Sequence, residues 1–214
     1  MSTLLIQSLC CERGERLLFS ELSFALSSGE GVRVAGANGS GKTSLLRCLA
    51  GISDNYSGII HWNDRDIRAL RQAFTANLLY LGHQPAVKST LTPIENLRWW
   101  SKLHGTPSDT RELLDALSQL RMEHVADTPC RYLSAGQQRR VALARLFIAT
   151  QTLWILDEPY TALDVDGIAR LEALFCEHLG REGMIIITTH QPISSGDFTT
   201  LDIDQLGREA QCVD

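Results

Sequence analysis

The residues with the clearest chemistry form one continuous run, Gly36-Ala37-Asn38-Gly39-Ser40-Gly41-Lys42-Thr43. The run matches the phosphate-binding loop pattern G-x-x-x-x-G-K-[ST] at every fixed position. Glycines let the backbone bend so that successive N–H groups point into one concavity, which holds an anion. Lys42 is expected to lie along the β- and γ-phosphates of a nucleotide, and the Thr43 hydroxyl is expected to bind Mg²⁺. The run therefore predicts a site for ATP and its magnesium ion.

The residues around this loop supply the elements that must position it. Residues 32–35 predict a short buried strand that enters the loop, and residues 44–50 predict a helix that leaves it, with Gly51 as a natural stop. The positive N-terminal end of that helix would face the same phosphates. A chance glycine-rich turn is the alternative, and the flanking strand and helix disfavour it.

An acidic pair stands at the end of another apolar run. Residues 153–156 predict a buried strand, and Asp157 and Glu158 follow at its carboxyl end, where parallel sheets bind ligands. Asp157 would bind Mg²⁺, directly or through a water, and Glu158 could polarise the water that attacks the γ-phosphate. Alone, the pair is equally typical of a strand-end turn. Together with the phosphate-binding loop, it predicts a hydrolytic site.

A third run, Leu133-Ser134-Ala135-Gly136-Gln137, predicts the start of a helix. Ser134 is expected to cap the helix, and Gln137, three residues later, is expected to reach back to it. A capped helix start with a serine hydroxyl and a glycine backbone is also an anion site. One ATP does not need two such sites from one chain, unless the second site serves the ATP of a neighbouring copy.

The composition bounds the class of protein. The chain has 214 residues, of which 44% are hydrophobic and 21% are charged, and its formal net charge is −5. These values indicate one large domain or two small lobes, with no overall basic field to attract nucleic acid. No apolar run approaches the roughly 20 residues that span a bilayer, and the first residues lack the positive segment of a signal peptide. We expect a cytoplasmic protein whose partner supplies any membrane part.

The cysteines do not indicate a metal site. None of the six lies in a C-x-x-C motif or at a Cys/His spacing typical of zinc, so most are expected to be buried small side chains. The adjacent pair Cys10-Cys11 leaves a metal or haem site as a weaker alternative. The six positions are Cys10, Cys11, Cys48, Cys130, Cys176 and Cys212.

The remaining elements follow a mixed pattern that is interrupted by helices. From Thr92 to about Leu133 the chain reads as helical, with Pro93 in a first turn and with Asp109 and Glu112 as the cap and partner of a second helix. A helix is expected at about 167–179. Strands are expected at residues 4–9, 17–19, 22–26, 58–62, 78–81, 184–187 and 198–204.

Taken together, these motifs resemble the ATP-binding cassette of ABC transporters over nearly the whole chain. The signature of that family is L-S-G-G-Q, and residues 133–137 match it with Ala135 as a mild departure. The resemblance implies an α/β fold, a P-loop cassette with a mixed-sheet RecA-like core, an N-terminal antiparallel β subdomain and a helical arm. It also implies a single domain, 1–214, with a core lobe at about 1–88 and 134–214 and a helical lobe at about 89–133.

The resemblance also assigns roles to single residues. Gln84 would touch Mg²⁺ and sense the membrane partner, and Asp157 would be a metal ligand. Glu158 would be the catalytic base, Asp164 would contact the neighbouring subunit, and His190 would sense the γ-phosphate.

The same resemblance implies how two copies share the nucleotide. Each ATP would lie between residues 36–43 of one copy and Ser134, Gly136 and Gln137 of the other. One position departs from the family, which stacks an aromatic side chain on adenine just before the position of Gly14. Here Cys11, Glu12 and Arg13 stand instead, so that either the Arg13 guanidinium stacks on the base or the contact with the base is weak.

A narrower resemblance is to the ATPase subunit of the bacterial cytochrome c maturation system, the haem exporter. It rests on the amino-acid sequences of four segments, residues 80–85, 91–97, 133–145 and 154–159. It implies integral permease subunits, a peripheral place on the cytoplasmic face of the inner membrane, and an ATP cycle that drives haem export or releases a haem-loaded chaperone. Of Trp99 and Trp100, both would pack in the arm, or one would face the permease.

Other functions stay open at this point. The chain could serve an ABC transporter for another cargo. A soluble ABC ATPase acting on DNA or ribosomes would carry long coiled coils or two fused cassettes, and 214 residues hold neither. A phosphate-loop kinase would not need residues 133–137, and an inactive structural subunit would not need Glu158 and His190.

Overall fold

The computed structural model describes residues 1–14, 16–194, 196 and 198–204. The described chain divides into two compact units. The first, here called the sheet unit, holds Met1–Tyr80, Gln151–Glu158 and the described residues from Phe175 onward. The second, the helical unit, holds Leu81–Thr150 and Pro159–Leu174. The two lobes expected from the sequence stay a prediction, because compactness alone does not show which parts move together.

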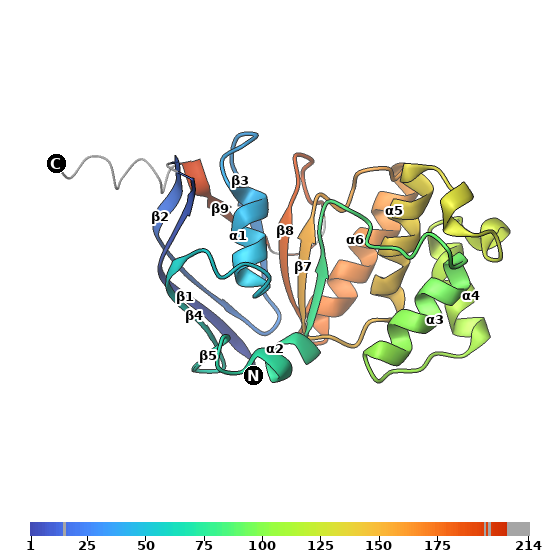
Figure 1. Ribbon diagram of the computed structural model, residues 1–214, viewed down its shortest axis with the longest axis horizontal. Helices are drawn as coiled ribbons and strands as arrows, with labels where there is room; N and C mark the ends of the chain where they lie inside the picture. The colour runs from blue at the N-terminus through green and yellow to red at the C-terminus, as the bar shows by residue number, and fades with distance from the viewer. Residues whose placement is uncertain (15, 195, 197, 205–214) are drawn as a thin grey trace. The chain divides into compact units, whose positions relative to one another are not determined.

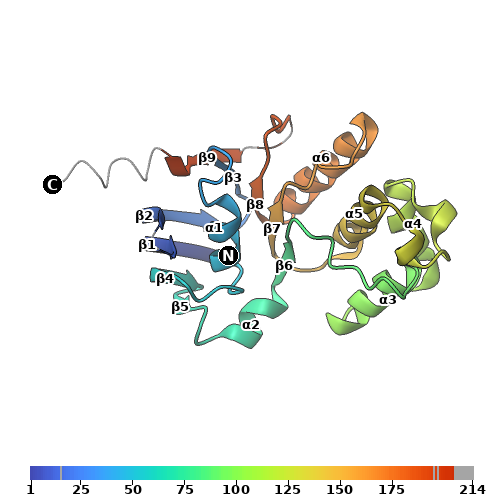
Figure 2. The same cartoon turned by 45° about the horizontal axis from the view of Figure 1, so that its top comes forward.

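The sheet unit contains an antiparallel sheet in the order β2-β1-β4-β5, and Figure 2 shows it with helix α1 beside it. Its strands are β1 (Thr3–Arg13), β2 (Arg16–Ser27), β4 (Ser57–Trp62) and β5 (Arg65–Asp66). Leu4 and Ile6 of β1 are buried, as are Leu9 and Cys11. The register of β1 against β2 shifts between Ile6 and Leu9, where Ser8 has a φ of 44°. The shift lets the side chains on both sides of it face the core.

The separate strands expected at 17–19 and 22–26 are wrong, because β2 is one continuous strand. The polar break between them is a β-bulge. The register with β1 shifts there, and Glu21 has a positive φ of 51° while its N–H donates to Cys10 Sγ at 3.3 Å. A bulge accommodates an extra residue without ending the strand.

A second sheet in the same unit has the order β6-β7-β8-β3-β9, and its central strands run side by side in Figure 1. The pairs β7/β8, β8/β3 and β3/β9 are parallel. Every residue of β7 and β8 is buried, as their continuous apolar runs predict. The strands are β3 (Gly31–Ala35), β6 (Leu78–Leu81), β7 (Leu153–Asp157), β8 (Met184–Thr188) and β9 (Phe198–Asp202).

Two helices complete this part of the unit, α1 (Lys42–Leu49) and α2 (Arg71–Ala76). Helix α1 has a short apolar face, and Leu45, Leu46 and Leu49 on it are fully buried. That face belongs to one hydrophobic core that also takes side chains from β1, β3, β7 and β8. The core therefore holds the start of α1 at the end of β3, which is where the phosphate-binding loop lies.

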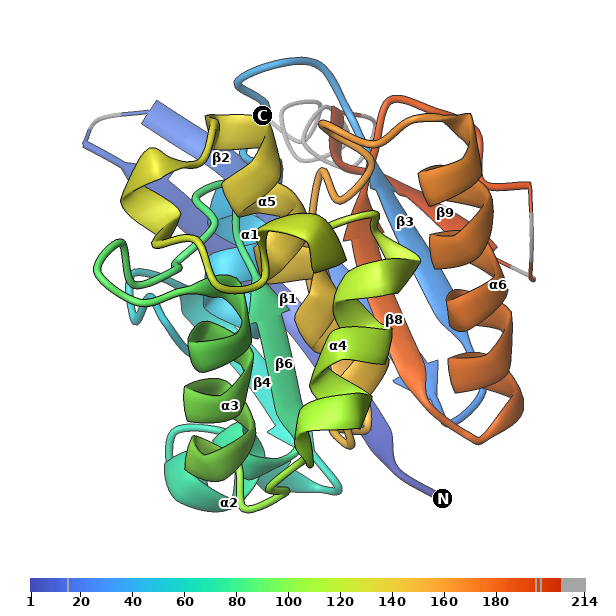
Figure 3. The same cartoon turned by 90° about the vertical axis from the view of Figure 1, so that its right-hand side faces the viewer.

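The helical unit is built from short helices with strong start signals. Capping boxes are present at Thr92/Glu95, Asp109/Glu112 and Ser134/Gln137, so the two caps predicted at Asp109 and Ser134 are confirmed. Helices α3 and α4 lie beside each other in Figure 3. The elements are α3 (Pro93–Leu103), α4 (Thr110–Gln119), η1 (Glu123–Val125), η2 (Cys130–Tyr132), α5 (Ala135–Leu143), η3 (Ala144–Ile148) and the first part of α6 (Val165–Gly180).

The two tryptophans of α3 differ in exposure. Trp100 is buried, whereas Trp99 is 41% exposed and lies under the ammonium group of Lys88, 4.1 Å from the ring centroid. Trp99 therefore faces outward, as in the alternative in which only one of the two tryptophans packs in the arm. Among the described helices, none has the length and apolar character to pass through a bilayer.

The cysteines are free thiols at the five described positions. Cys11, Cys48 and Cys130 are buried as expected, but Cys176 is exposed. Burial raises the pKa of Cys48 to about 12, which makes its thiol unreactive. Cys212 lies outside the described residues.

The stability of the sheet unit should depend on the neutral form of His178. The imidazole stacks on Trp154 with centroids 3.7 Å apart, and Nε2 lies 3.1 Å from the Thr152 carbonyl oxygen. Burial lowers the pKa of His178 below its ordinary value. Since the unfolded chain then binds the proton more readily, the free energy of unfolding should decrease as the pH falls below about 6.5.

We therefore expect the melting temperature between pH 7 and pH 5 to fall less steeply in His178→Gln than in the parent protein. The unfolded and folded states of the parent differ by at most one proton at His178. The free energy of unfolding therefore changes by at most about 1.4 kcal/mol per pH unit through this residue. Differential scanning calorimetry across this range measures it, with the exposed His124→Gln as the matched control. Equal slopes for His178→Gln and the parent would contradict the assignment.

Candidate functional site

The phosphate-binding loop joins β3 to α1, and its glycines have the backbone angles that only glycine adopts easily. The φ angles of Gly36, Gly39 and Gly41 are 148°, 80° and 104°. At Gly36 a Cβ atom would lie 2.7 Å from Ser40 Oγ and 2.9 Å from Ile203 Cγ1. A side chain there would push the loop out of shape, so the glycine is needed for the close approach as well as for the turn.

Lys42 closes the loop from its helical end. Its ammonium donates to the carbonyl oxygens of Gly36, at 2.7 Å, and Ala37, at 2.8 Å. The positive charge thus lies against the loop at the start of α1, where the free N–H groups of the first turn also concentrate positive potential. This arrangement fits a bound chain of phosphates.

Asp204 also contacts the loop, and sequence reasoning missed it. The N–H of Ala37 donates to Asp204 Oδ2 at 2.6 Å. A carboxylate oxygen here shows that this loop amide is oriented to bind an anion. Nothing in the sequence marks Asp204, because the contact joins residues that are 167 positions apart.

The predicted metal ligands meet at the end of β7. Asp157 is buried, and its Oδ2 accepts a hydrogen bond from Thr43 Oγ1 at 2.9 Å. Its Oδ1 accepts one from Thr188 Oγ1 at 2.7 Å. A hydroxyl and a carboxylate are hard oxygen ligands that suit Mg²⁺, with phosphate oxygens to complete the shell. The pair therefore fits the ion that the loop predicts.

Thr188 is a second residue that sequence reasoning missed. It ends the apolar run of β8, and a buried hydroxyl at that point is a weak signal for a polar contact. Both oxygen atoms of Thr188 accept the N–H of Glu158, the carbonyl oxygen at 3.1 Å and Oγ1 at 3.0 Å. Thr188 thus orients Asp157 and holds the backbone of Glu158.

Glu158 and His190 lie together where β7 and β8 end. Glu158 Oε1 is 3.6 Å from His190 Nε2. Glu158 has a φ of 49°, an uncommon backbone state for a non-glycine residue, which the two bonds from its N–H help to hold. The Glu158 side chain is 24% exposed and the His190 side chain is 60% exposed, while Glu158 Oε1 itself is buried. A carboxylate in this place can accept a proton from a water that binds beside it.

In the helical unit, the start of α5 presents Ser134. Its Oγ accepts a hydrogen bond from Gln137 N–H at 3.2 Å, and Gln137 Oε1 accepts one from Ser134 N–H at 2.9 Å. Ser134 is exposed, and its hydroxyl proton remains able to donate. At Gly136 a Cβ atom would lie 3.4 Å from Ala162 Cβ. The helix start is therefore ordered, polar and accessible.

Two arginines of the same helical segment hold the loop that carries Gln84. The Arg139 guanidinium donates to the carbonyl oxygens of Gly82 and His83, and Arg145 Nη2 donates to Ala86 O at 2.8 Å. Burial lowers the pKa of Arg145 to about 10. Gln84 itself is exposed. The backbone on both sides of Gln84 is thus tied to α5 and to η3.

The predicted residues divide between the two units, and printed contacts join those of the sheet unit. The sheet unit joins residues 36–43, Asp157, Glu158 and His190, and the helical unit carries Gln84, Ser134, Gly136, Gln137 and Asp164. Arg13 is the exposed last residue of β1, and its stacking on adenine stays a prediction.

Known proteins similar to this chain include a whole family and individual relatives. The family model for ABC transporters matches residues 19–161. The cytochrome c biogenesis ATP-binding export protein CcmA of Saccharophagus degradans is 44% identical over 208 residues, which cover 94% of this chain and 92% of that protein. The protein of the same name from Escherichia coli K12 is 47% identical over 194 residues, 91% of this chain and 92% of the relative.

Solved structures share the fold. A putative ABC transporter ATP-binding protein from Pyrococcus furiosus superposes with a TM-score of 0.81 at 23% identity, covering 95% of this chain and 98% of the other. An ATP-binding cassette solved as a dimer in a post-hydrolysis state with ADP and Pi gives 0.79 at 20% identity, covering 94% and 96%. With the family match over most of the chain, the two-sheet fold and the built phosphate-binding loop, the chain belongs to the ABC transporter family of ATP-binding proteins.

Proposed function

We propose that the chain is the ATP-hydrolysing subunit of a membrane ABC transporter complex that serves c-type cytochrome maturation. Its ATP cycle would drive haem export or release a haem-loaded chaperone. The observation that carries the ATPase is the network in which Asp157 binds Thr43 and Thr188 while Glu158 lies beside His190. The cytochrome role is supported by 44% and 47% identity to two proteins named for cytochrome c biogenesis and export.

The sheet unit binds the triphosphate through residues 36–43. The loop N–H groups and the Lys42 ammonium hold the phosphates, and the carbonyl bonds that Lys42 makes here keep its charge in place until nucleotide binds. Thr43 and Asp157 would hold Mg²⁺, which would draw charge from the phosphoryl oxygens when bound, and Gln84 stays a predicted ligand of the same ion.

Hydrolysis is assigned to Glu158 with His190. Water attacks the γ-phosphorus as the Glu158 carboxylate takes its proton, and the bond between the γ-phosphorus and the bridging oxygen breaks to give ADP and phosphate. His190, whose Nε2 is 3.6 Å from Glu158 Oε1, would donate to a γ-phosphate oxygen and hold the carboxylate in position.

A second copy of the chain completes the site. The start of α5 is a second anion-binding position, and one nucleotide needs only one from each chain. We infer a head-to-tail dimer in which Ser134, Gly136 and Gln137 of one copy cover the triphosphate of the other, with Asp164 at the contact. The Arg13 guanidinium would stack on adenine.

Permease subunits would place the chain on the cytoplasmic face of the inner membrane as a peripheral protein. Trp99 and Leu103, one helical turn apart on α3, are 41% and 63% exposed. Exposed large apolar side chains that adjoin each other are typical of an interaction surface. We infer that this face of the arm contacts the permease. Transport of another cargo would use the same contact, whereas an ABC ATPase without a permease would not.

A co-purification experiment separates these functions. We expect the chain, tagged and expressed with its full partner set, to co-purify with integral membrane proteins from detergent-solubilised membranes. The double variant Trp99→Glu/Leu103→Glu should lose most of this association while the purified chain keeps its ATPase rate, and Leu114→Glu on α4 serves as the matched control. A protein that is absent from the membrane fraction would exclude the transporter function.

A further inference from the structure

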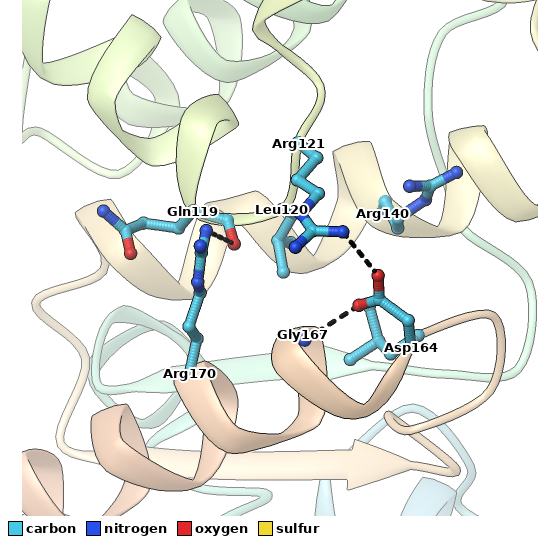
Figure 4. A pocket seen from close by; sticks show the side chains of 8 residues that line it. Gln119, Leu120, Arg121, Arg140, Asp164, Gly167 and Arg170 are labelled. Carbon is cyan, nitrogen blue, oxygen red and sulfur yellow. Dashed lines mark hydrogen bonds and ion pairs between the residues drawn. The ribbon is translucent and has the colours of Figure 1, made fainter.

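The helical unit contains a polar pocket whose lining includes Asp164 and three arginines, Arg121, Arg140 and Arg170 (Figure 4). Arg121 is the central contact. Its Nη1 donates to Asp164 Oδ2 at 3.0 Å, and its Nη2 donates to Asp166 Oδ2 at 2.5 Å. We call this pair of contacts the Arg121 bridge. It joins the end of α4 to the start of α6.

The backbone at Arg121 is unusual. Arg121 is the second residue after α4, and its φ is 55°, in the left-handed region where helices commonly place glycine. An arginine there costs roughly 1 kcal/mol more than glycine. The contacts of the side chain must therefore explain why arginine stands here in place of glycine, and those contacts are the Arg121 bridge.

A second arginine joins the same two elements in the opposite direction. Arg170 of α6 donates through Nη1 to the carbonyl oxygens of Gln119, at 3.0 Å, and Ser118, at 3.3 Å. These oxygens belong to the last turn of α4, where the Ser118 oxygen also accepts the Arg121 N–H at 3.0 Å. The end of α4 and the start of α6 are thus held by contacts from both sides.

Asp164 is oriented at both of its carboxylate oxygens. Oδ1 accepts the N–H of Gly167 at 2.9 Å, and this bond together with Arg121 lowers the pKa of Asp164. Ala162, two residues earlier, has a φ of 72°. The segment from Ala162 to Asp164 therefore has a particular conformation that depends on contacts outside itself.

The bridge is exposed, which limits its effect on stability. The side chains of Arg121, Asp164 and Asp166 are 53%, 56% and 64% exposed. Ion pairs with this exposure contribute about 1 kcal/mol or less to folding. The bridge is thus better suited to orienting the segment than to stabilising the fold.

We propose that Arg121 is a positioning residue that holds Asp164 and Asp166 in the arrangement that a second copy of this chain contacts. The inference rests on the proposed function, because that function assigns Asp164 to the contact between copies. It adds a role for the end of α4: the orientation of the Asp164 segment, and with it the closure of two chains on ATP, depends on the Arg121 guanidinium.

The test measures dimerisation separately from nucleotide binding. In a Glu158→Gln background with saturating ATP, Arg121→Ala should raise the protein concentration at which half of the chains are dimeric by about tenfold, measured by analytical ultracentrifugation. The ATP affinity of the monomer should stay unchanged. With Glu158 intact, the rate per chain should fall at low protein concentration and recover at high concentration, which damage to the fold would not produce.

Three further variants make the result specific. Arg111→Ala removes an arginine within α4, paired with Asp115 at 3.9 Å and 90% exposed, and should have no effect. Arg121→Lys keeps the charge but not the two-pronged contact, so it should give an intermediate shift. Asp166→Asn should weaken dimerisation in the same direction, and adding it to Arg121→Ala should cause little further loss.

The outcomes separate the two proposals. If the Glu158→Gln protein itself remains monomeric with ATP bound, the proposed function fails and this inference fails with it. If that protein dimerises and Arg121→Ala dimerises equally well or better, only the role of Arg121 is overturned. Should Arg121→Ala prove unfolded by calorimetry, the folded Asp166→Asn variant decides by the same measurement.

Discussion

Replacing Glu158 by glutamine should lower the rate of ATP hydrolysis by about 10²- to 10⁴-fold, the range that a positioned general base contributes. The amide has nearly the same shape as the carboxylate but cannot accept the proton of the attacking water. The backbone bonds from Glu158 N–H to Thr188 do not involve the side chain, so the loop should keep its conformation. Phosphate release under single-turnover conditions measures the loss.

The same variant should still bind ATP and should accumulate as an ATP-bound dimer. Nucleotide affinity depends on residues 36–43, which the substitution leaves in place, and the dimer is no longer opened by hydrolysis. Size-exclusion chromatography with light scattering, with and without ATP, reports the change of mass. The control is Glu182→Gln, an exposed carboxylate on the turn before β8. Undiminished turnover would remove Glu158 from the chemistry, and a monomer with ATP bound would remove the dimer.

Lys42→Ala should have the second large effect, a loss of ATP affinity of about 10²- to 10³-fold. The ammonium is expected to make two charge-assisted hydrogen bonds to the phosphates, and each of these contributes about 1.5–3 kcal/mol. A loss of 1.4 kcal/mol corresponds to about tenfold in affinity. Part of this binding free energy is offset in the intact protein, because Lys42 must first give up its hydrogen bonds to the carbonyl oxygens of Gly36 and Ala37.

Isothermal titration with ATP and Mg²⁺ measures this prediction. Lys102→Ala, an exposed lysine on α3, is the matched control and should bind ATP as the parent protein does. The melting temperature of Lys42→Ala without nucleotide should change little, since the two carbonyl oxygens can bind water instead. An affinity within threefold of the parent would show that the loop amides hold the phosphates without this charge.

Several features of the site were predictable because the physics behind them is local. The backbone angles of Gly36, Gly39 and Gly41 follow from the loop motif. The capping boxes at Asp109 and Ser134 join residues only three positions apart, so the order of residues is enough to indicate them. The buried strands β7 and β8 follow from continuous apolar runs.

Other features could not be read in this way. The bulge at Glu21 joins what look like two strands, because a polar residue in a strand and a polar residue in a turn have the same sequence signal. Thr188 contacts Asp157 only because β8 pairs with β7 in the observed register, Asp157 opposite Thr188. Asp204 contacts the phosphate-binding loop only because β9 pairs with β3.

The order of residues thus predicted the phosphate-binding loop at 36–43 and the capped helix start at Ser134, whereas the two-sheet cassette was implied by the family resemblance. The loop and the helix start depend on backbone preferences and short-range hydrogen bonds, which act over a few residues. The folded chain alone revealed the partners of Asp157, the carboxylate at Ala37 N–H and the Arg121 bridge. Each of these joins side chains that are distant along the chain, and strand register and helix packing set which of them meet.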